Sequence, residues 1–157
     1  MRFLFLIFGC GLLFSACDTN RVYEYNKEFS DRTWKMKDTA VFDFQIKNAE
    51  QKYNLYYNVR NTIDYPYARL FINYALTDSV GNVLSKKLIN NDLFDQKTGR
   101  PNGNSGLGDI YDHQFLLLDN LQFAHNGKYR LKLEQYMRKD TLPGVIAVGF
   151  RLEHSEK

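Results

Sequence analysis

The sequence predicts an all-β protein folded as an antiparallel β-sandwich. Apolar and polar residues alternate with a period of two through most of the chain after residue 39, as in strands with one buried and one wet face. Clusters of glycine, proline, asparagine and aspartate separate these segments at the spacing of turns. No segment of useful length shows the helical period of about 3.6 residues. An immunoglobulin-like Greek-key arrangement is favoured, and a jelly roll is the alternative.

The first three clear strands are predicted from segments rich in aromatic and β-branched residues, at 40–47, 53–61 and 69–77. In the first of them, Phe42, Phe44 and Ile46 share one face. Turn residues at 48–51 and 64–66 separate these strands. Residues 78–82 are predicted to form a hairpin loop before a strand at 83–89.

Three more strands are predicted near the C-terminus, at 110–118, 128–136 and 145–153. Tyr129 begins the second of them directly after a turn at Asn126 and Gly127. This arrangement resembles the tyrosine corner, in which the phenol bonds back to nearby backbone as the chain crosses between sheets. Gly149, inside the last strand, indicates a bulge or a close backbone approach. Trp34 is expected to be a buried anchor for the first strand, with an exposed stacking ring as the alternative.

Residues 90–109 are the exception to the alternation. This segment holds four of the ten glycines and few apolar residues. A connection this long is uncommon in a compact domain and is usually functional or mobile. We expect it at one end of the sandwich.

The first seventeen residues have the composition of an export signal. Arg2 gives a short basic start, residues 3–14 are an apolar run too short to span a bilayer, and Ser15 and Ala16 precede Cys17. This order resembles a bacterial lipoprotein signal, in which a diacylglyceryl group is attached to the cysteine and the chain is cut before it. An ordinary secretory signal cleaved near Ala16 is the alternative. The predicted division is a signal peptide, a lipidated tether with the first edge, and one β-sandwich domain carrying the long loop 90–109, at residues 1–16, 17–37 and 38–157.

The charge and the cysteine content limit which classes of partner and which cross-links are expected. The formal net charge is +3, and the basic residues are scattered along the chain. No run of lysine and arginine predicts binding to nucleic acid or to an acidic membrane patch. Cys10 leaves with the signal and Cys17 would carry lipid, so the mature domain has no disulfide and depends on packing.

The sequence offers no catalytic site, so we expect no enzyme activity, no metal and no cofactor. The three histidines are far apart and lack metal-ligand spacing, and no serine lies in a G-x-S-x-G turn. The only side chains that could be nominated for an enzyme are Asp92, Asp109, Asp112 and His113. Calcium held by acids around the long loop is a further alternative, with the candidate ligands Asp92, Asp95, Asp109 and Asp112.

Aromatic residues make up 15% of the chain, which suits a sandwich that lacks disulfides and uses large rings as its core. The alternative is an exposed aromatic strip that stacks on a sugar or contacts a protein. The candidates for that strip are Tyr56, Tyr65 and Tyr67.

The C-terminal third carries a specific resemblance. Its matching parts, in order, are a Gly-x-Tyr strand start, Met137-Arg138, Leu142-Pro143-Gly144 and Val148-Gly149. The lipoprotein signal, the opening at 22–25 and the glycine-rich segment ending at Asp109 match as well, so most of the chain resembles the gliding-motility lipoprotein family GldH of Bacteroidota.

This resemblance implies a structural, non-enzymatic component of the gliding apparatus and its associated type IX secretion machinery. Such a component would be lipid-anchored in the cell envelope and would contact other envelope proteins. Residues 18–21 contain a single acid, which favours the periplasmic side over the cell surface. A carbohydrate-binding module on a surface lipoprotein is the alternative.

Bacteria of this group attach O-glycans at Asp-Ser/Thr followed by a small or apolar residue. Three tripeptides match that pattern, and their acceptor residues are Thr39, Ser79 and Thr141.

Overall fold

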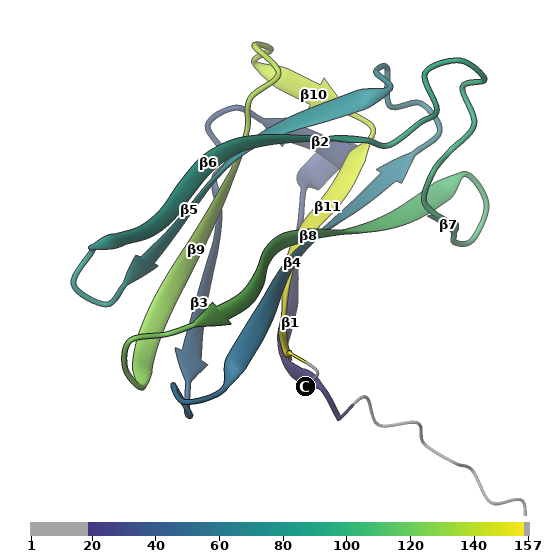
Figure 1. Cartoon of the computed structure of the whole chain (residues 1–157). Helices are drawn as coiled ribbons and strands as arrows, with labels where there is room; N and C mark the ends of the chain where they lie inside the picture. Colours follow the sequence, from purple (N-terminus) through teal and green to yellow (C-terminus); the bar gives the residue numbers. More distant parts are fainter. Residues whose placement is uncertain (1–18, 156–157) are drawn as a thin grey trace, which may run out of the picture.

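A computed structural model describes residues 19–155, which form two antiparallel sheets layered face to face (Figure 1). One sheet has five strands in the order β1-β11-β4-β8-β7. Their bounds are Arg21–Glu28, Val145–His154, Lys52–Thr62, Ile110–Gln122 and Asn104–Ser105. The other has four strands in the order β3-β9-β5-β6. Their bounds are Ala40–Ile46, Gly127–Gln135, Arg69–Asp78 and Val83–Asp92.

A short ribbon closes one end of the sandwich. It pairs β2 (Thr33–Lys35) with β10 (Thr141–Pro143). A single 3-10 turn, η1 (Ser30–Arg32), leads from β1 into β2. The predicted all-β class and antiparallel sandwich are therefore confirmed, and no α-helix occurs within residues 19–155.

The core is one cluster of buried side chains from both sheets, as the alternation predicts. Phe44 of the four-stranded sheet lies 4.9 Å, centroid to centroid, from Phe150 of the five-stranded sheet. Trp34 is fully buried and stacks on Phe29 at 5.2 Å. The indole Nε1 of Trp34 donates a hydrogen bond of 2.9 Å to the carbonyl of Asp38. The expectation of a buried anchor is confirmed.

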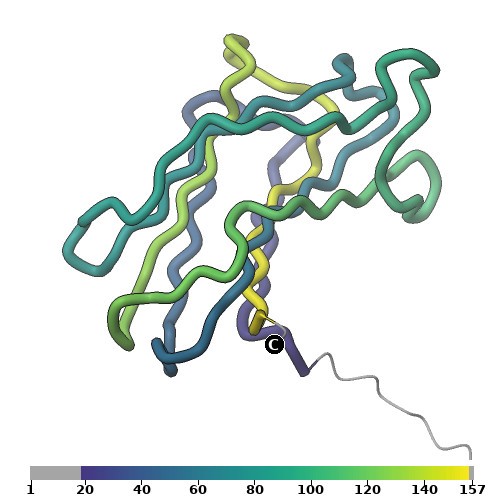
Figure 2. The backbone as a smooth tube through the Cα atoms, in the orientation of Figure 1, coloured from purple at the N-terminus to yellow at the C-terminus, as the bar shows by residue number. Residues whose placement is uncertain are grey.

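The chain crosses repeatedly from one sheet to the other (Figure 2). Residues 48–51 join β3 to β4, which lie in different sheets, so this turn is a crossing. The predicted hairpin at 78–82 does join two paired strands, β5 and β6. At the crossing from β8 to β9, the Tyr129 hydroxyl donates a hydrogen bond of 2.8 Å to the carbonyl of His125. That is the contact expected of a tyrosine corner.

The long loop is more ordered than its composition suggests. Leu93 and Phe94 are buried, and both of their backbone N–H groups donate to the carbonyl of Ala68. Farther along, β7 pairs with the start of β8. The loop lies where β4 ends, because Ile63 N donates to the carbonyl of Asp109.

The two ends of the sandwich therefore differ. The long loop and the β2–β10 ribbon lie at one end, which we call the loop end. The start of β1 lies at the opposite end, the anchor end, where Asn20 accepts a hydrogen bond of 2.8 Å from His154 N. Residues 21–35 of the segment expected to be tether and first edge form β1, η1 and β2.

Candidate functional site

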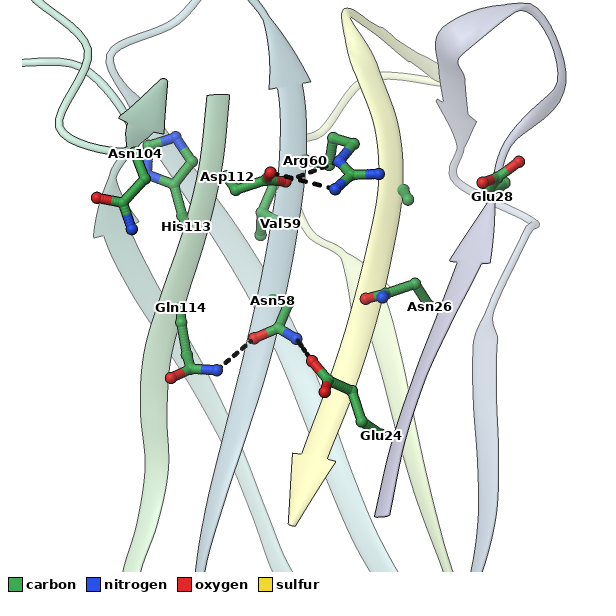
Figure 3. Close-up of a pocket in the computed structure, with 11 residues that line it drawn as sticks. Glu24, Asn26, Glu28, Asn58, Val59, Arg60, Asn104, Asp112, His113 and Gln114 are labelled. Carbon is green, nitrogen blue, oxygen red and sulfur yellow. Dashed lines mark hydrogen bonds and ion pairs between the residues drawn. The ribbon is translucent and has the colours of Figure 1, made fainter. Parts of the chain in front are cut away.

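The outer face of the five-stranded sheet carries a polar groove of about 380 Å³ (Figure 3). We call it the sheet groove. Strands β1, β4, β7 and β8 supply its polar side chains, which are Glu24, Asn26, Glu28, Asn58, Arg60, Asn104, Asp112 and Gln114. Its depth arises from β11, which runs between β1 and β4 and presents Ala147 to the groove.

Gly149 is the second small residue on that part of β11. A Cβ atom at this position would overlap the side-chain oxygen of Asn26. The Asn26 side chain therefore lies across Gly149, to which it is opposed in the β1–β11 pair. The sequence predicts a bulge or a close backbone approach at Gly149. The structure has no register shift there, and the group closest to an added Cβ is the Asn26 side chain, with the carbonyl of Tyr25 at 3.1 Å.

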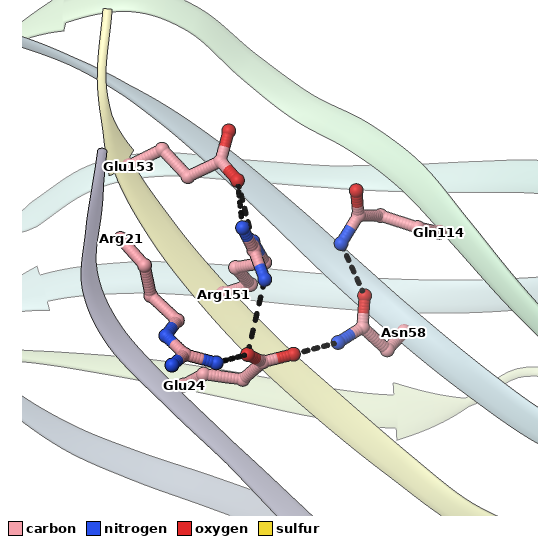
Figure 4. A network of polar contacts seen from close by, with 6 residues as sticks. All are labelled: Arg21, Glu24, Asn58, Gln114, Arg151 and Glu153. Carbon is pink, nitrogen blue, oxygen red and sulfur yellow. Dashed lines mark hydrogen bonds and ion pairs between the residues drawn. The ribbon is translucent and has the colours of Figure 1, made fainter. Parts of the chain in front are cut away.

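Glu24 is the centre of a polar network that extends along the same face (Figure 4). Its Oε2 accepts hydrogen bonds from Arg21 at 2.9 Å and from Arg151 at 3.1 Å. Its Oε1 accepts one of 3.3 Å from the Asn58 amide, which in turn accepts one of 3.2 Å from Gln114. The network thus crosses all four long strands of the sheet. Such a chain of hydrogen bonds holds the exposed side chains in defined positions.

A second, separate contact fixes the loop-end side of the groove. Arg60 donates two hydrogen bonds to the Asp112 carboxylate, at 2.7 and 3.1 Å. These hydrogen bonds raise the pKa of Arg60 above its usual value. Glu28 lies across the groove on β1. Three carboxylates and one guanidinium line the groove. Because Glu24 is also paired with two arginines, and Asp112 with Arg60, the excess negative charge lies at Glu28.

The structure separates the side chains nominated for an enzyme. Asp92 is paired with Arg69 at 2.6 Å, and the hydrogen bond from that guanidinium lowers the pKa of Asp92. Asp109 is exposed at the end of the loop. Asp112 and His113 are consecutive on β8, so their side chains leave opposite faces of the strand.

His113 is 94% buried at the edge of the groove, since its exposed fraction is 6%. Its ring stacks on Phe115 at 5.7 Å and is covered by Gly103, where a Cβ would lie 2.7 Å from Nε2. Burial lowers the pKa of His113, although the charge of Asp112 opposes this effect. The imidazole is thus held neutral and packed against Phe115 and Gly103.

The acids proposed for calcium do not converge either. Asp95 accepts hydrogen bonds from the backbone N–H groups of Lys97 and Thr98 within its own turn. Asp92 forms an ion pair with Arg69, and Asp112 forms one with Arg60. Within residues 19–155 there is no group of three or more His, Cys, Asp or Glu side chains placed to hold a metal ion.

The three candidate tyrosines do not form one exposed strip. Tyr65 is buried, and its hydroxyl donates a hydrogen bond of 3.0 Å to the carbonyl of Arg69. Tyr67 is half-buried and meets the Tyr65 ring edge-on at 5.8 Å. Tyr56 is half-buried on β4, on the same face as Asn58 because the two residues are two positions apart. Of the three, only Tyr56 lies on the outer face of the five-stranded sheet that carries the sheet groove.

The candidate modification sites differ in exposure. Ser79 and Thr141 are exposed, on the β5–β6 hairpin and on β10. Thr39 is half-buried, and its hydroxyl donates a hydrogen bond of 3.2 Å to Glu134. Cys17, the predicted lipidation site, lies outside the described residues.

The sequence did not predict the sheet groove. Alternation places Asn58, Arg60 and Gln114 on a wet face, yet strand pairing is what brings β8 beside β4. Gly149 was the available signal, because a glycine within a strand marks a place where something approaches closely.

Comparison with known proteins identifies relatives over the whole domain. The model of the GldH lipoprotein family matches residues 21–152. The chain is 30% identical to a gliding motility lipoprotein GldH homolog of Christiangramia forsetii, over 92% of this chain and 91% of that one. It is 27% identical to the gliding motility lipoprotein GldH of Flavobacterium johnsoniae, over 96% of this chain and 95% of that one.

Similarity to solved structures is weak. Latent PorU of Porphyromonas gingivalis aligns with a TM-score of 0.39 and 9% identity, over 87% of this chain and 13% of that one. Accessory secretory protein 1, 2 and 3 of Streptococcus pneumoniae aligns with a TM-score of 0.32 and 10% identity, over 88% and 91%. Similarity at this level has no bearing on function.

No helix among residues 19–155 has the length and apolar character needed to cross a bilayer. The family match spans nearly all of the described sandwich and agrees with the residues that first indicated the family. The chain therefore belongs to the GldH lipoprotein family, and it is a membrane-anchored lipoprotein of the cell envelope.

Proposed function

We propose that this protein is a non-catalytic component of a gliding-motility and type IX secretion apparatus that works by binding another envelope protein. In this proposal a lipid on Cys17 holds the domain at the membrane, on its periplasmic side. The relatives named as gliding motility lipoproteins support the setting. The scattered positions of the candidate catalytic acids support a role in binding.

The sheet groove is the observation that carries the proposal. A face of the sandwich and the long loop meet here, since Asn104 of the loop lines the groove with side chains of β1, β4 and β8. The polar network holds Glu24, Asn58 and Gln114 in place, so at these residues a partner would meet a pre-organised surface with little loss of side-chain entropy. The excess of carboxylates favours a partner segment that carries lysine or arginine.

A photo-crosslinking residue at Gln114 in the full-length protein tests this proposal in intact envelopes. We expect it to capture one defined protein, and we expect Glu28→Arg to abolish that product because it reverses a charge in the groove. The matched control is the same crosslinker at Asn73, a half-buried position on the four-stranded sheet. Equal products from both positions, or products unaffected by Glu28→Arg, would contradict docking at the groove.

Carbohydrate binding is the second candidate, and one observation favours it. The groove is lined by amide and carboxylate side chains, and Tyr56 lies two positions before Asn58 on the same face of β4; these are the groups that hydrogen-bond and stack on sugars. Under this alternative, titration calorimetry with envelope glycans would show binding that Tyr56→Ala removes. Tyr67→Ala, away from the groove, would leave that binding intact.

A further inference from the structure

The anchor end of the sandwich is tied closely to the predicted lipidation site. Asn20 is fixed by its hydrogen bond to His154 N, and only Asp18 and Thr19 separate it from Cys17. Consecutive Cα atoms are about 3.8 Å apart, so the three peptide units between Asn20 and a lipid-bearing Cys17 would reach at most about 11 Å. Such a short tether would keep the anchor end near the bilayer surface.

An apolar hairpin tip lies at that end. The β5–β6 hairpin begins at Asp78, which is paired with Tyr129 near the start of β9 (Figure 1). Val80 at its tip is 81% exposed, and Val83 is 59% exposed. The Asp78 carboxylate accepts hydrogen bonds from Val80 N and Asn82 N, at 3.0 and 2.9 Å, so the turn presents Val80 in a defined position. The tip is at the same end of the sandwich as the start of β1, on the opposite edge of the four-stranded sheet from β3. An apolar tip at the end that carries a membrane anchor suits the lipid interface.

Lysines gather on the sheet face next to this hairpin. Lys128, Arg130 and Lys132 alternate along β9 and line a hollow of about 720 Å³ that the hairpin borders. Lys132 and Lys86 are both opposite Ala75, one on each side, so they lie in one row across three strands.

Most of this positive charge is not neutralised. Arg130 is paired with Asp43 at 2.6 Å. Lys128 is close enough to Asp43 to contribute to the lowered pKa of that carboxyl. Among the residues that the structure describes, however, no ion pair within 4.0 Å holds Lys86, Lys128 or Lys132. The Asp78 carboxylate is occupied by its own turn. Lys128 and Lys132 alternate with other residues along β9, and Lys86 comes from β6, so they do not form a continuous basic run in the sequence. The fold collects them into what we call the lysine face: Lys86, Lys128 and Lys132.

We propose that the lysine face and the Val80 hairpin form a second membrane contact, which binds an acidic phospholipid surface. Val80 enters the interface while the three ammonium groups bind head-group phosphates, because they are close to the surface that the anchor defines. The orientation rests on the proposed lipid at Cys17, but the contact is a property of the folded domain alone.

Vesicle co-sedimentation tests this contact without the anchor. A chain that begins at Asp18 keeps every strand, because the whole sandwich lies within residues 19–155. We expect it to co-sediment with vesicles of phosphatidylcholine mixed with phosphatidylglycerol, and not with vesicles of phosphatidylcholine alone. Each lysine near an acidic surface strengthens partitioning roughly five-fold, so replacing all three by glutamine should weaken binding about 100-fold. Val80→Asp should weaken it as well.

A matched control removes the same three charges at the loop end: Lys35→Gln, Lys97→Gln and Lys139→Gln. We expect this variant to bind acidic vesicles as the parent does. Equal losses in both triple variants, or no binding of the parent to acidic vesicles, would overturn the proposal. Circular dichroism confirms that each variant is folded, and membrane fractionation of Cys17→Ala tests the anchor separately.

The proposal also makes a prediction about Ser79. A glycan there would hold the neighbouring Val80 away from lipid, so the two roles of this hairpin exclude each other. Mass spectrometry of the mature protein should find Ser79 unmodified, and a glycan at this position would overturn the membrane contact.

Discussion

Gly149 shows how one missing side chain can shape a face of the molecule. The Asn26 side chain occupies the space that a Cβ would need. Gly149→Ala should lower the free energy of unfolding by about 1–3 kcal/mol, because the added methyl forces Asn26 and the backbone of β1 to move. Urea denaturation measures the loss.

A double-mutant cycle that combines Gly149→Ala with Asn26→Ala tests whether the Asn26 side chain causes this loss of stability. Removing the Asn26 amide should recover part of the loss, although not all of it, since the carbonyl of Tyr25 also lies 3.1 Å from the added Cβ. Strictly additive losses would mean that Asn26 is not the obstacle.

His113 gives the protein a specific dependence on pH. Burial lowers its pKa, so below about pH 6.5 the unfolded chain takes up a proton that the folded chain does not. The free energy of unfolding should therefore fall as the pH drops from about 6.5 towards the folded-state pKa. His113→Gln should flatten this part of the profile, as measured by denaturation at several pH values.

His125→Gln is the control, because it removes an exposed imidazole. It should leave the slope unchanged. The ion-paired carboxyl of Asp92 has a lowered pKa, so its contribution is lost only below about pH 4, outside this window. A slope that survives in His113→Gln would show that another group is responsible.

At the scale of elements, the turn between β10 and β11 depends on a glycine at position 144. Gly144 has a φ of 81°, and a Cβ there would lie 2.7 Å from the Cα of Tyr65. Gly144→Ala should therefore lower the free energy of unfolding by about 2–4 kcal/mol. The positive φ strains an alanine backbone, and the added Cβ clashes with main-chain atoms of Tyr65, which cannot move away as a flexible side chain could. Gly81→Ala is the matched comparison, with a φ of 93° and open space, and should cost about 1 kcal/mol. Similar losses in thermal or urea unfolding would mean that the contact with Tyr65 does not matter.

The strands of the core were predictable because each needs only its own alternation. β3, β4 and β5 bury alternate residues as the sequence indicates. The edge strand β1 was not predicted as a complete strand, because an edge position leaves its Tyr25 58% exposed and weakens the pattern. The groove and the lysine face were unpredictable for a different reason. Both depend on which strands are neighbours, and β4 and β8 pair across a sequence separation that no local pattern encodes.

At the scale of the whole molecule, the two proposed binding surfaces lie on different sheets of the sandwich. The lysine face lies on the four-stranded sheet near the anchor end. The sheet groove lies on the five-stranded sheet and includes a residue of the long loop. A domain seated on lipid by the first surface would leave the second free for a partner. The predicted acceptor Thr141 is on β10 at the loop end, where a glycan would not interfere with lipid contact.

The lipid anchor itself is tested by Cys17→Ala in the full-length chain. Acyl chains bury many methylenes at about 0.8 kcal/mol each, so the native protein should stay with membranes through washes in about 0.5 M salt. The lysine face alone is electrostatic and should yield to the same wash. Cys17→Ala should therefore leave part of the protein bound at low salt and release it at high salt, as membrane fractionation can measure. Cys10→Ala, within the predicted signal peptide, should behave as the native protein does. Salt-resistant membrane association of Cys17→Ala would show that something other than this cysteine holds the domain in place.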